Sequence, residues 1–390
     1  MTFPSKVILY CLVILRSKGS EFLKSIIRFA KRNTVFVIAL FAMVVTMFFV
    51  PVDKAYLGYF DFKTLTCLFC VLAVVCALKN VNFFYILAKK IVRKFGNLRM
   101  CVIALVYITF IGSMLIANDM ALLTFLPLGY FVLDTTGKKE YMAFTFIMQN
   151  IAANLGGMLT PFGNPQNLYL YTKFNIPTLE FMQIMLLPFV ISIAMITVCC
   201  IIFVKPEKLE INDDSDSFEP KRTALYLALF ALSIAIVFRG IPYPIGLIVI
   251  PAVLIFADRK ALKMVDYPLL GTFAAFFVFS SNMARIEPVR ELLSRLLDKS
   301  TLIFSTLSCQ FISNVPSAIL LSQFTNNYKE LLVGVNIGGT GTFIASLASL
   351  ITLREYMLRD FNGIKRYGKM FCGFNFGFLA VLLIVMYCVM

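Results

Sequence analysis

The chain has 390 residues, of which 60% are hydrophobic and 15% are charged. Soluble domains carry about 25% charged residues, so the composition excludes a soluble globular protein and indicates an integral membrane protein. The formal net charge of +15 does not indicate nucleic acid binding, because the basic residues lie in short segments between apolar runs, as membrane topology requires.

Apolar runs long enough to cross a bilayer recur along the chain. The predicted spans, in chain order, are 34–51, 63–78, 141–172, 178–204, 222–238, 242–257, 268–283, 330–352 and 371–389. Two further pairs of helices, 100–134 and 300–328, are predicted to form hairpins. The sequence therefore predicts an all-α polytopic protein of the cell membrane with about 9–10 transmembrane helices.

The basic residues predict how the spans are oriented. If the N-terminus is cytoplasmic, most of the 36 Lys and Arg residues fall in cytoplasmic segments, as the positive-inside rule requires. Residues 79–99 and 134–140 are both basic and belong on one side, so the hairpin between them must enter the membrane and return. The second hairpin is placed on the opposite face, with 284–299 outside. Two halves of opposite orientation form an inverted repeat.

Four parts follow from this topology. Residues 1–33 are a basic cytoplasmic or interfacial segment, and whether the piece at 7–30 crosses the membrane is left open. Residues 34–204 form the first repeat, 205–221 a polar cytoplasmic linker, and 222–390 the second repeat. Each repeat contains one hairpin followed by one broken helix.

Two further features recur in the halves. Asp61 begins one span, and Asp266 begins its counterpart. Each of these spans leads to an amphipathic segment, 83–95 in the first half and 288–299 in the second. Such segments are expected to lie in the membrane interface as connecting arms.

A polar, glycine-rich stretch interrupts the predicted spans 141–172 and 330–352. It reads NLGGMLTPFGNPQNLY at 154–169 and NIGGTGTFIASLASLI at 336–351. When the two copies are aligned without a gap, the first asparagine, the glycine pair and one threonine are identical. Lipid does not tolerate broken backbone unless protein or a water-filled cavity covers it. A duplicated break at membrane depth therefore predicts a transporter's binding site.

The first hairpin carries a carboxylate at its tip. Asp119 is the only acidic residue that we expect deep in the membrane, where an ionised carboxylate without a partner costs several kcal/mol. We therefore assign Asp119 to a coupling cation. The alternative is that Asn118 or Asp119 caps the second helix of the hairpin, and the two roles are compatible.

The first break combines helix-breaking residues with amides. Pro161, Gly163 and Pro165 prevent continuous helical hydrogen bonding. The freed carbonyls between 160 and 164 can coordinate a hard cation, and the half-helix that follows suits an anion at its N-terminus. The amides at its start are Asn164, Gln166 and Asn167. The alternative is a kinked packing helix with small residues at its interface.

The second break is built differently. It has no proline, and hydroxyl side chains of Thr342, Ser346 and Ser349 replace the proline and amide pattern. No carboxylate matches Asp119. A second cation site would therefore consist of neutral oxygens.

These motifs resemble the ion transporter superfamily, which groups citrate transporter-like permeases, divalent anion/sodium symporters, and the arsenite permease and sodium–proton antiporter families. The resemblance rests on the hairpin tips AND (117–119) and SNV (313–315), on GGMLTPFGNPQN (156–167) and on GGTGTFIASLASL (338–350). It implies two re-entrant hairpins that face two broken helices, with sodium between each tip and its unwound helix and substrate between the tips. It also implies a homodimer.

The resemblance assigns roles residue by residue. The first cation or coupling site comprises Asn118, Asp119, Gly156, Thr160 and Gly163. The second comprises Ser313, Asn314, Gly338, Thr342 and Ser346. The substrate residues are Asn164, Gln166, Asn167, Asn314 and Ser349.

The hairpin tips depart from those of the dicarboxylate symporters. Those proteins carry Ser-Asn-Thr in both tips, whereas this chain has Ala-Asn-Asp in the first and Ser-Asn-Val in the second. A negative Asp119 near the substrate disfavours a dicarboxylate unless sodium or a proton neutralises it. In this respect the chain is more similar to the arsenite and sodium–proton branch.

We expect a secondary active transporter that moves a small anion, a carboxylate such as citrate or an oxyanion, coupled to sodium or protons by alternating access. The alternatives are a sodium–proton antiporter and an arsenite-type permease. The expected partners are the anion, the coupling ion, the lipid bilayer and a second copy of the chain. No enzyme activity, cofactor or metal other than sodium is expected, since the chain has no histidine and no catalytic pairing of side chains at membrane depth.

Overall fold

The computed structural model describes residues 29, 33–92, 94–208 and 219–390. All the named elements of these residues are helices, and two strand-like residues, Asn97 and Lys208, form an isolated bridge. The all-α prediction is therefore confirmed. The question of whether 7–30 crosses the membrane lies outside the described residues.

Along the chain, the helices of the first half follow one another in the order that the sequence predicts. They are α2 (Thr34–Phe49), η1 (Lys54–Gly58), α3 (Phe62–Asn80), α4 (Phe83–Val92), α5 (Leu98–Ile116), α6 (Asn118–Thr135), η2 (Lys139–Tyr141), α7 (Met142–Gly156), η3 (Gly157–Leu159), α8 (Pro165–Lys173) and α9 (Thr178–Phe203).

The second half repeats the pattern of a hairpin followed by an interrupted helix. Its helices are α10 (Pro220–Val237), α11 (Tyr243–Ala257), α12 (Arg259–Met264), α13 (Tyr267–Arg285), α14 (Glu287–Lys299), α15 (Thr301–Ile312), α16 (Asn314–Leu321), α17 (Tyr328–Ile337), α18 (Leu347–Met357) and α19 (Ile364–Val389).

The chain is a multi-pass membrane protein. Among the described residues, α3, α5, α9, α10 and α19 are each long and apolar enough to cross a bilayer. Helices α13 and α14 qualify together but are bent by 96° at their junction, where the predicted span ends and the predicted amphipathic arm begins. The number of spans stays a prediction, because α2, α11 and α15 are shorter apolar helices.

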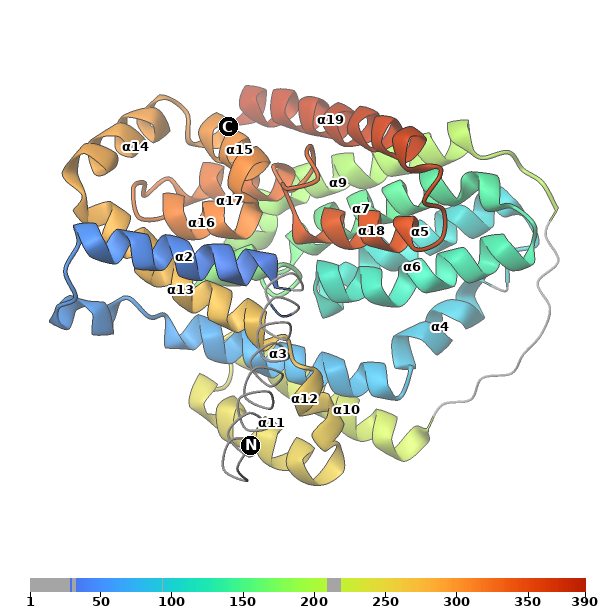
Figure 1. Cartoon of the computed structure of the whole chain (residues 1–390). Helices are drawn as coiled ribbons and strands as arrows, with labels where there is room; N and C mark the ends of the chain where they lie inside the picture. The colour runs from blue at the N-terminus through green and yellow to red at the C-terminus, as the bar shows by residue number, and fades with distance from the viewer. Residues whose placement is uncertain (1–28, 30–32, 93, 209–218) are drawn as a thin grey trace, which may run out of the picture.

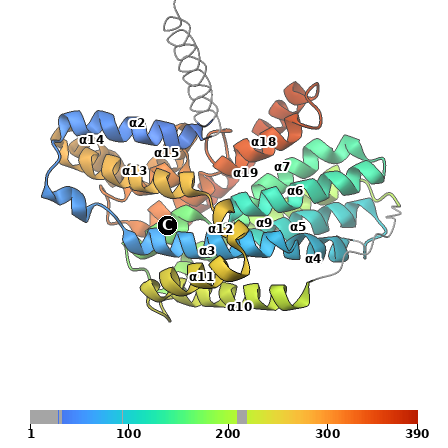
Figure 2. The same ribbon diagram turned by 60° about the horizontal axis from the view of Figure 1, so that its bottom comes forward.

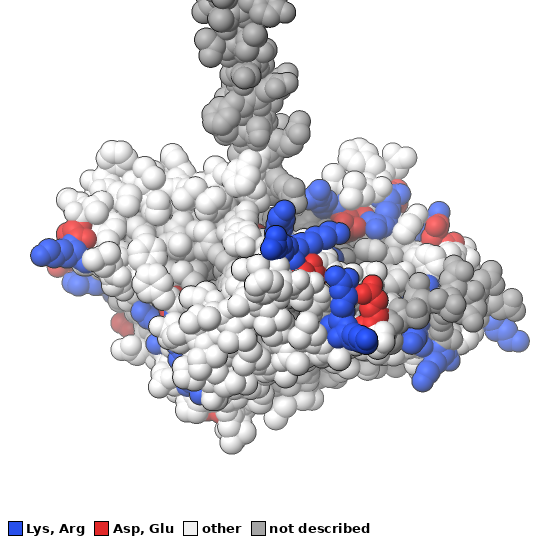
Figure 3. All heavy atoms as spheres, turned by 90° about the horizontal axis from the view of Figure 1, so that it is seen from below, with Lys and Arg blue, Asp and Glu red and all other residues white. Residues whose placement is uncertain are grey.

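The helices form two side-by-side groups (Figures 1 and 2). Helix α2 lies along α13, while α5, α6 and α7 lie together on the other side of the molecule. Helices α3, α10 and α11 pack on one another along one edge. Seen from that edge, a few charged side chains lie at the left margin and a larger group extends from the middle to the right, with a broad, mostly uncharged area between them (Figure 3). An uncharged band of this kind suits contact with lipid.

Both hairpins turn through the same unusual backbone conformation. Ala117 has φ 64° and ψ 152°, and Ser313 has φ 74° and ψ 158°. Non-glycine residues rarely adopt positive φ, and such strain concentrates at functional sites. In each hairpin the next residue is an asparagine whose side-chain oxygen accepts a hydrogen bond from the following backbone N–H, at 2.9 Å in both.

Both predicted helix breaks are present. Helix α7 ends at Gly156 and α8 begins at Pro165, while α17 ends at Ile337 and α18 begins at Leu347. The residues before α8 and α18 share an extended conformation. The second break needs no proline because Gly341, with φ 115°, turns the chain there.

Each break is fastened to its hairpin by the same hydroxyl contact. Thr160 Oγ1 donates to the carbonyl of Met114 at 2.8 Å, and Thr342 Oγ1 donates to the carbonyl of Gln310 at 3.0 Å. The capping residues match as well, since Asp61 accepts from the third N–H of α3 and Asp266 from the third N–H of α13, both at 3.0 Å. These contacts support an internal repeat, and the opposite orientation of its halves stays a prediction.

Candidate functional site

Four helix N-termini meet at one cavity of about 200 Å³. They belong to α6 and α16, the second helices of the hairpins, and to α8 and α18, the helices that follow the breaks. The residues that line the cavity are Val35, Ile38, Asn118, Asp119, Pro165, Gln166, Leu269, Thr272, Phe311, Ile312, Ser313, Asn314, Val315, Pro316, Ile344, Ser346, Leu347 and Leu350.

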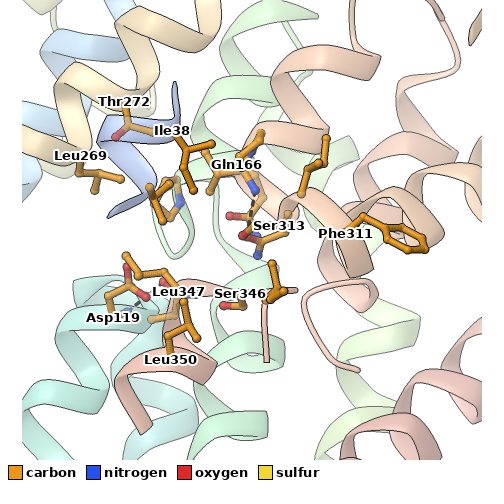
Figure 4. Close-up of a pocket in the computed structure, with 18 residues that line it drawn as sticks. Ile38, Asp119, Gln166, Leu269, Thr272, Phe311, Ser313, Ser346, Leu347 and Leu350 are labelled. Carbon is orange, nitrogen blue, oxygen red and sulfur yellow. Dashed lines mark hydrogen bonds between the residues drawn. The ribbon is translucent and has the colours of Figure 1, made fainter. Parts of the chain in front are cut away.

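Six residues that the sequence predicts for the site line this cavity. They are Asn118, Asp119, Gln166, Ser313, Asn314 and Ser346. In Figure 4, Asp119 lies beside Leu347 and Leu350, while Gln166 and Ser313 lie close together. Within the described part of the chain, no Lys or Arg lines the cavity. Positive potential in the cavity therefore comes from helix ends and from any bound cation.

Asn154 of α7 ties the first hairpin to the second break. Its Oδ1 accepts from Ser346 Oγ at 2.7 Å and from Asn118 Nδ2 at 3.2 Å. Its Nδ2 is buried and has no partner among the described residues. Asn154 therefore fixes two residues that line the cavity, although it does not line the cavity itself.

Asn336 of α17 makes the reciprocal contacts to the first break. Its Nδ2 donates to Asn167 Oδ1 at 2.6 Å, and its Oδ1 accepts from Asn164 Nδ2 at 3.3 Å and from Gln166 Nε2 at 3.4 Å. Each half thus holds the broken helix of the other half through one asparagine. The sequence aligns Asn154 with Asn336 but does not assign either to the site.

The amide of Asn167 satisfies the freed carbonyls of the first break. Its Nδ2 donates to the carbonyls of Gly157, Met158 and Thr160 at 3.2 to 3.3 Å. Asn167 is fully buried and does not line the cavity. Its role as a substrate ligand stays a prediction, and the structure gives it a role in shaping the break.

Asp119 has an unpaired carboxylate oxygen. Its Oδ1 is buried and without a hydrogen-bond partner in the described part of the chain. Asn164 Oδ1 and Gln166 Oε1 are also buried and unpaired. Buried polar atoms without partners are rare and call for an explanation, such as a ligand. All three atoms are oxygens with free lone pairs, so they can coordinate a cation or accept a hydrogen bond from a protonated group.

The other residues of the first predicted cation site lie in packing contacts. A Cβ at position 156 would come within 2.2 Å of the carbonyl oxygen of Phe110, so Gly156 permits the close approach of α7 to α5. Gly163 packs against the carbonyl of Gly157, and the Thr160 hydroxyl donates a hydrogen bond to the carbonyl of Met114 in α5. None of these three lines the cavity with Asp119.

Of the second predicted cation site, Ser313 and Ser346 line the cavity, while Gly338 and Thr342 hold the break. The sequence reasoning missed Gln310 of α15, which fastens that break. Its Nε2 donates to the carbonyls of Gly338 and Thr340, at 2.9 and 3.1 Å, and its Oε1 accepts from the N–H of Thr342 at 2.9 Å. The first half has Met114 at the position that corresponds to Gln310, so comparing the two halves does not single out Gln310.

Ser349 lies on α18 between the lining residues Leu347 and Leu350 but does not itself line the cavity. Its Oγ accepts from Asn150 Nδ2 at 3.3 Å, and Asn150 Oδ1 accepts from Thr352 Oγ1 at 3.3 Å. Asn150 and Asn154 are one helical turn apart on an apolar helix, a spacing that could have identified both from the sequence.

A neighbouring cavity shares part of this lining. This second cavity, of about 300 Å³, shares Leu269, Thr272 and Leu347 with the first and is also lined by Asp266 and Arg354. Residues 258–266 and 353–369 are predicted to be cytoplasmic. We call this second cavity the mouth.

Interrupted helices whose ends converge on a cavity within an apolar bundle are typical of secondary transporters. The fold and the site therefore define a membrane transporter.

The chain belongs to the citrate transporter family, whose profile matches residues 13–329. It is 34% identical over 295 residues to an uncharacterized transporter from Methanocaldococcus jannaschii, covering 75% of this chain and 81% of the relative. It is 27% identical over 318 residues to the inner membrane protein YbiR of Escherichia coli, covering 79% and 83% of the two chains.

Proposed function

We propose that this chain is a secondary active transporter that moves a small anion, a carboxylate such as citrate or an oxyanion, by alternating access. The observation that carries the proposal is the convergence of four helix N-termini on one cavity. Backbone N–H groups and the positive dipole ends at helix N-termini attract anions. Membership of the citrate transporter family supports a small anionic substrate.

Asp119 supplies the coupling in this proposal. It is the one charged residue of the cavity lining, and its carboxylate repels an anion as long as it is ionised. A proton or a sodium ion that neutralises Asp119 removes this repulsion. The anion therefore binds well only together with the cation, which is the condition for symport.

Gln166 and Asn314 are the proposed anion ligands, because each has a side-chain amide N–H and lines the cavity at or beside a helix N-terminus. A thermal-shift screen of the purified protein with citrate, phosphate and sodium tests this. A ligand that binds the folded state at 100 times its Kd stabilises it by about 2.7 kcal/mol, which raises the melting temperature.

The matched variants for this screen are Gln166→Ala and Gln183→Ala. Gln183 is exposed on α9 and lines none of the cavities described above. We expect Gln166→Ala to lose most of the shift that the anion causes and Gln183→Ala to keep it. Equal shifts in the two variants would remove Gln166 from the site.

A sodium–proton antiporter is the second candidate. The observation that favours it is a cavity lining with one carboxylate and no basic side chain. Sodium flux into liposomes in the absence of any organic or inorganic substrate anion, abolished by Asp119→Asn, would support antiport. Flux that requires the anion would support symport.

We also propose that the halves form an inverted repeat and that the protein is a homodimer. The matched hairpin tips and hydroxyl contacts support the repeat, and the superfamily resemblance supports the dimer. Light scattering of the purified protein measures the oligomeric mass, and accessibility of single cysteines placed near 137 and 299 tests whether the two hairpins open to opposite sides.

A further inference from the structure

A small cavity of about 80 Å³, which we call the narrow cavity, is lined by Asp119 and shares Asp266, Leu269, Leu347 and Ile351 with the mouth. Its walls are apolar side chains from α3, α6, α8, α13 and α18, together with residues of the first break. Asp119 and Asp266 are the ionisable residues of its lining. The two carboxylates therefore face one small, otherwise apolar space.

The two aspartates differ in their surroundings. Asp266 is exposed, caps α13 through Oδ1 and also lines the mouth, so that it meets solvent. Asp119 lies deeper, and its buried Oδ1 has no partner among the described residues. The narrow cavity is thus lined by a solvent-exposed carboxylate and by a half-buried one with an unpaired, buried Oδ1.

No other charged residue in the described part of the chain lines this space. On the elements packed around Asp119 the charged residues are Lys89, Lys90, Arg99, Lys139, Glu140, Glu355 and Arg354, the last of which lines the mouth. Around Asp266 they are Lys63 and Lys79 of α3, Arg259, Lys260 and Lys263 of α12, and Asp258, which caps α12. Glu355 is paired with Arg359, and Lys139 with Asp134.

We propose that Asp266 collects protons at the mouth and passes them through the narrow cavity to Asp119. In this step the O–H bond of a protonated Asp266 breaks, intervening water relays the proton, and an O–H bond forms on Asp119. Asp266 is left ionised and Asp119 neutral. The inference rests on the proposed function, because it specifies the coupling ion of that transporter.

The chemistry of the passage selects a proton over sodium. A cavity of this size holds a few water molecules, and a carboxylate at each end gives them polar partners. A sodium ion would have to leave most of its water shell among leucine, valine and phenylalanine side chains, which supply no oxygen ligands. The wider route through the mouth remains for the anion, with Arg354 at its edge.

The test compares Asp266→Asn with Asp61→Asn. Asn keeps the capping function at both positions, and Asp61 caps α3 in the way Asp266 caps α13. Asp61 lines a different cavity of about 530 Å³ that contains neither Asp119 nor Asp266. Asp61→Asn is therefore the control for a lost surface carboxylate.

Citrate transport is measured in liposomes in two modes. Exchange of labelled for unlabelled citrate at equal pH requires anion binding but no release of the proton, whereas uptake driven by a pH gradient requires both. We expect Asp266→Asn to slow driven uptake about tenfold or more and to leave exchange near the wild-type rate. Asp61→Asn should leave both unchanged. Wild-type driven uptake in Asp266→Asn would overturn the proposal.

A second readout needs no anion. Infrared spectroscopy after a pH jump follows the carbonyl band of protonated Asp119, identified by its loss in Asp119→Asn. Asp266→Asn should delay the appearance of this band about tenfold, and an unchanged rate would overturn the proton route. If wild-type protein shows this band and Asp266→Asn delays it, but wild-type protein shows neither mode of citrate transport, the proposed anion is wrong and the proton route stands.

Discussion

Asn336→Ala removes the side chain through which the second half holds the first break. Asn336 makes four hydrogen bonds, one to the carbonyl of Leu332 in its own helix and three across to the first half. The three partners in the first half are Asn164, Gln166 and Asn167. The variant therefore breaks a connection between the halves and not just a local contact.

The cost follows from these contacts. Interhelical hydrogen bonds in membrane proteins average about 0.6 kcal/mol each, so the loss of three lowers the free energy of unfolding by about 2 kcal/mol. The amide of Asn167 also loses its shortest partner, at 2.6 Å, which loosens the turn before α8. Anion binding through Gln166 should weaken as well.

Asn375→Ala is the matched control. Asn375 is equally buried, but its Nδ2 donates to the carbonyl of Phe371 one turn back in the same helix. Its loss should cost no more than about 0.6 kcal/mol. Unfolding in mixed micelles, followed by circular dichroism, measures both. If Asn336→Ala costs no more than Asn375→Ala, the reciprocal asparagine contacts do not hold the halves together.

Two further predictions concern the first hairpin and the ion pair between Asp53 and Arg285. Ala117→Gly should raise the free energy of unfolding by about 1 kcal/mol, because glycine adopts the positive φ of this tip without strain; a less stable variant in the same unfolding assay would argue against strain. Arg285 hydrogen-bonds Asp53 and holds the pKa of that carboxyl below its usual value of 3.8. Since the folded-state pKa is lowered, the pair stabilises the fold at neutral pH, and this contribution is lost as pH falls below about 4. In Asp53→Asn the melting temperature should therefore fall less steeply as the pH is lowered below about 4. The same fall as in wild type would contradict a stabilising role for this ion pair.

The hairpin tips and breaks could be predicted because their signals are local. Glycine and proline interrupt the helices whatever surrounds them, and a lone carboxylate in an apolar stretch is costly without a function. The break at 338–346 was predicted in the same way, from glycines and from its likeness to the first. The amphipathic period of 288–299 is likewise local, and α14 bends by 96° from α13 there, while the interfacial position of both arms stays a prediction.

The direction of each amide could not be predicted, because it depends on partners far away in the sequence. Asn167 and Gln166 are neighbours at the start of α8, yet one amide turns to the carbonyls of the break and the other lines the cavity. In the sequence, Gln310 is a single polar residue in an apolar helix. Its role follows only from its hydrogen bonds to the second break. The narrow cavity between Asp119 and Asp266 likewise exists only in the packed structure.

The central claim is that an anion bound at the four helix N-termini is carried with a cation that neutralises Asp119. The most direct measurement is accumulation of labelled citrate in liposomes with and without an inward gradient of protons or sodium, for wild type, Asp119→Asn and Asp119→Glu. We predict that wild type accumulates citrate above its external concentration only with the gradient. Asp119→Asn should only equilibrate it, and Asp119→Glu should retain part of the accumulation. Gradient-driven accumulation by Asp119→Asn at the wild-type level would contradict the account.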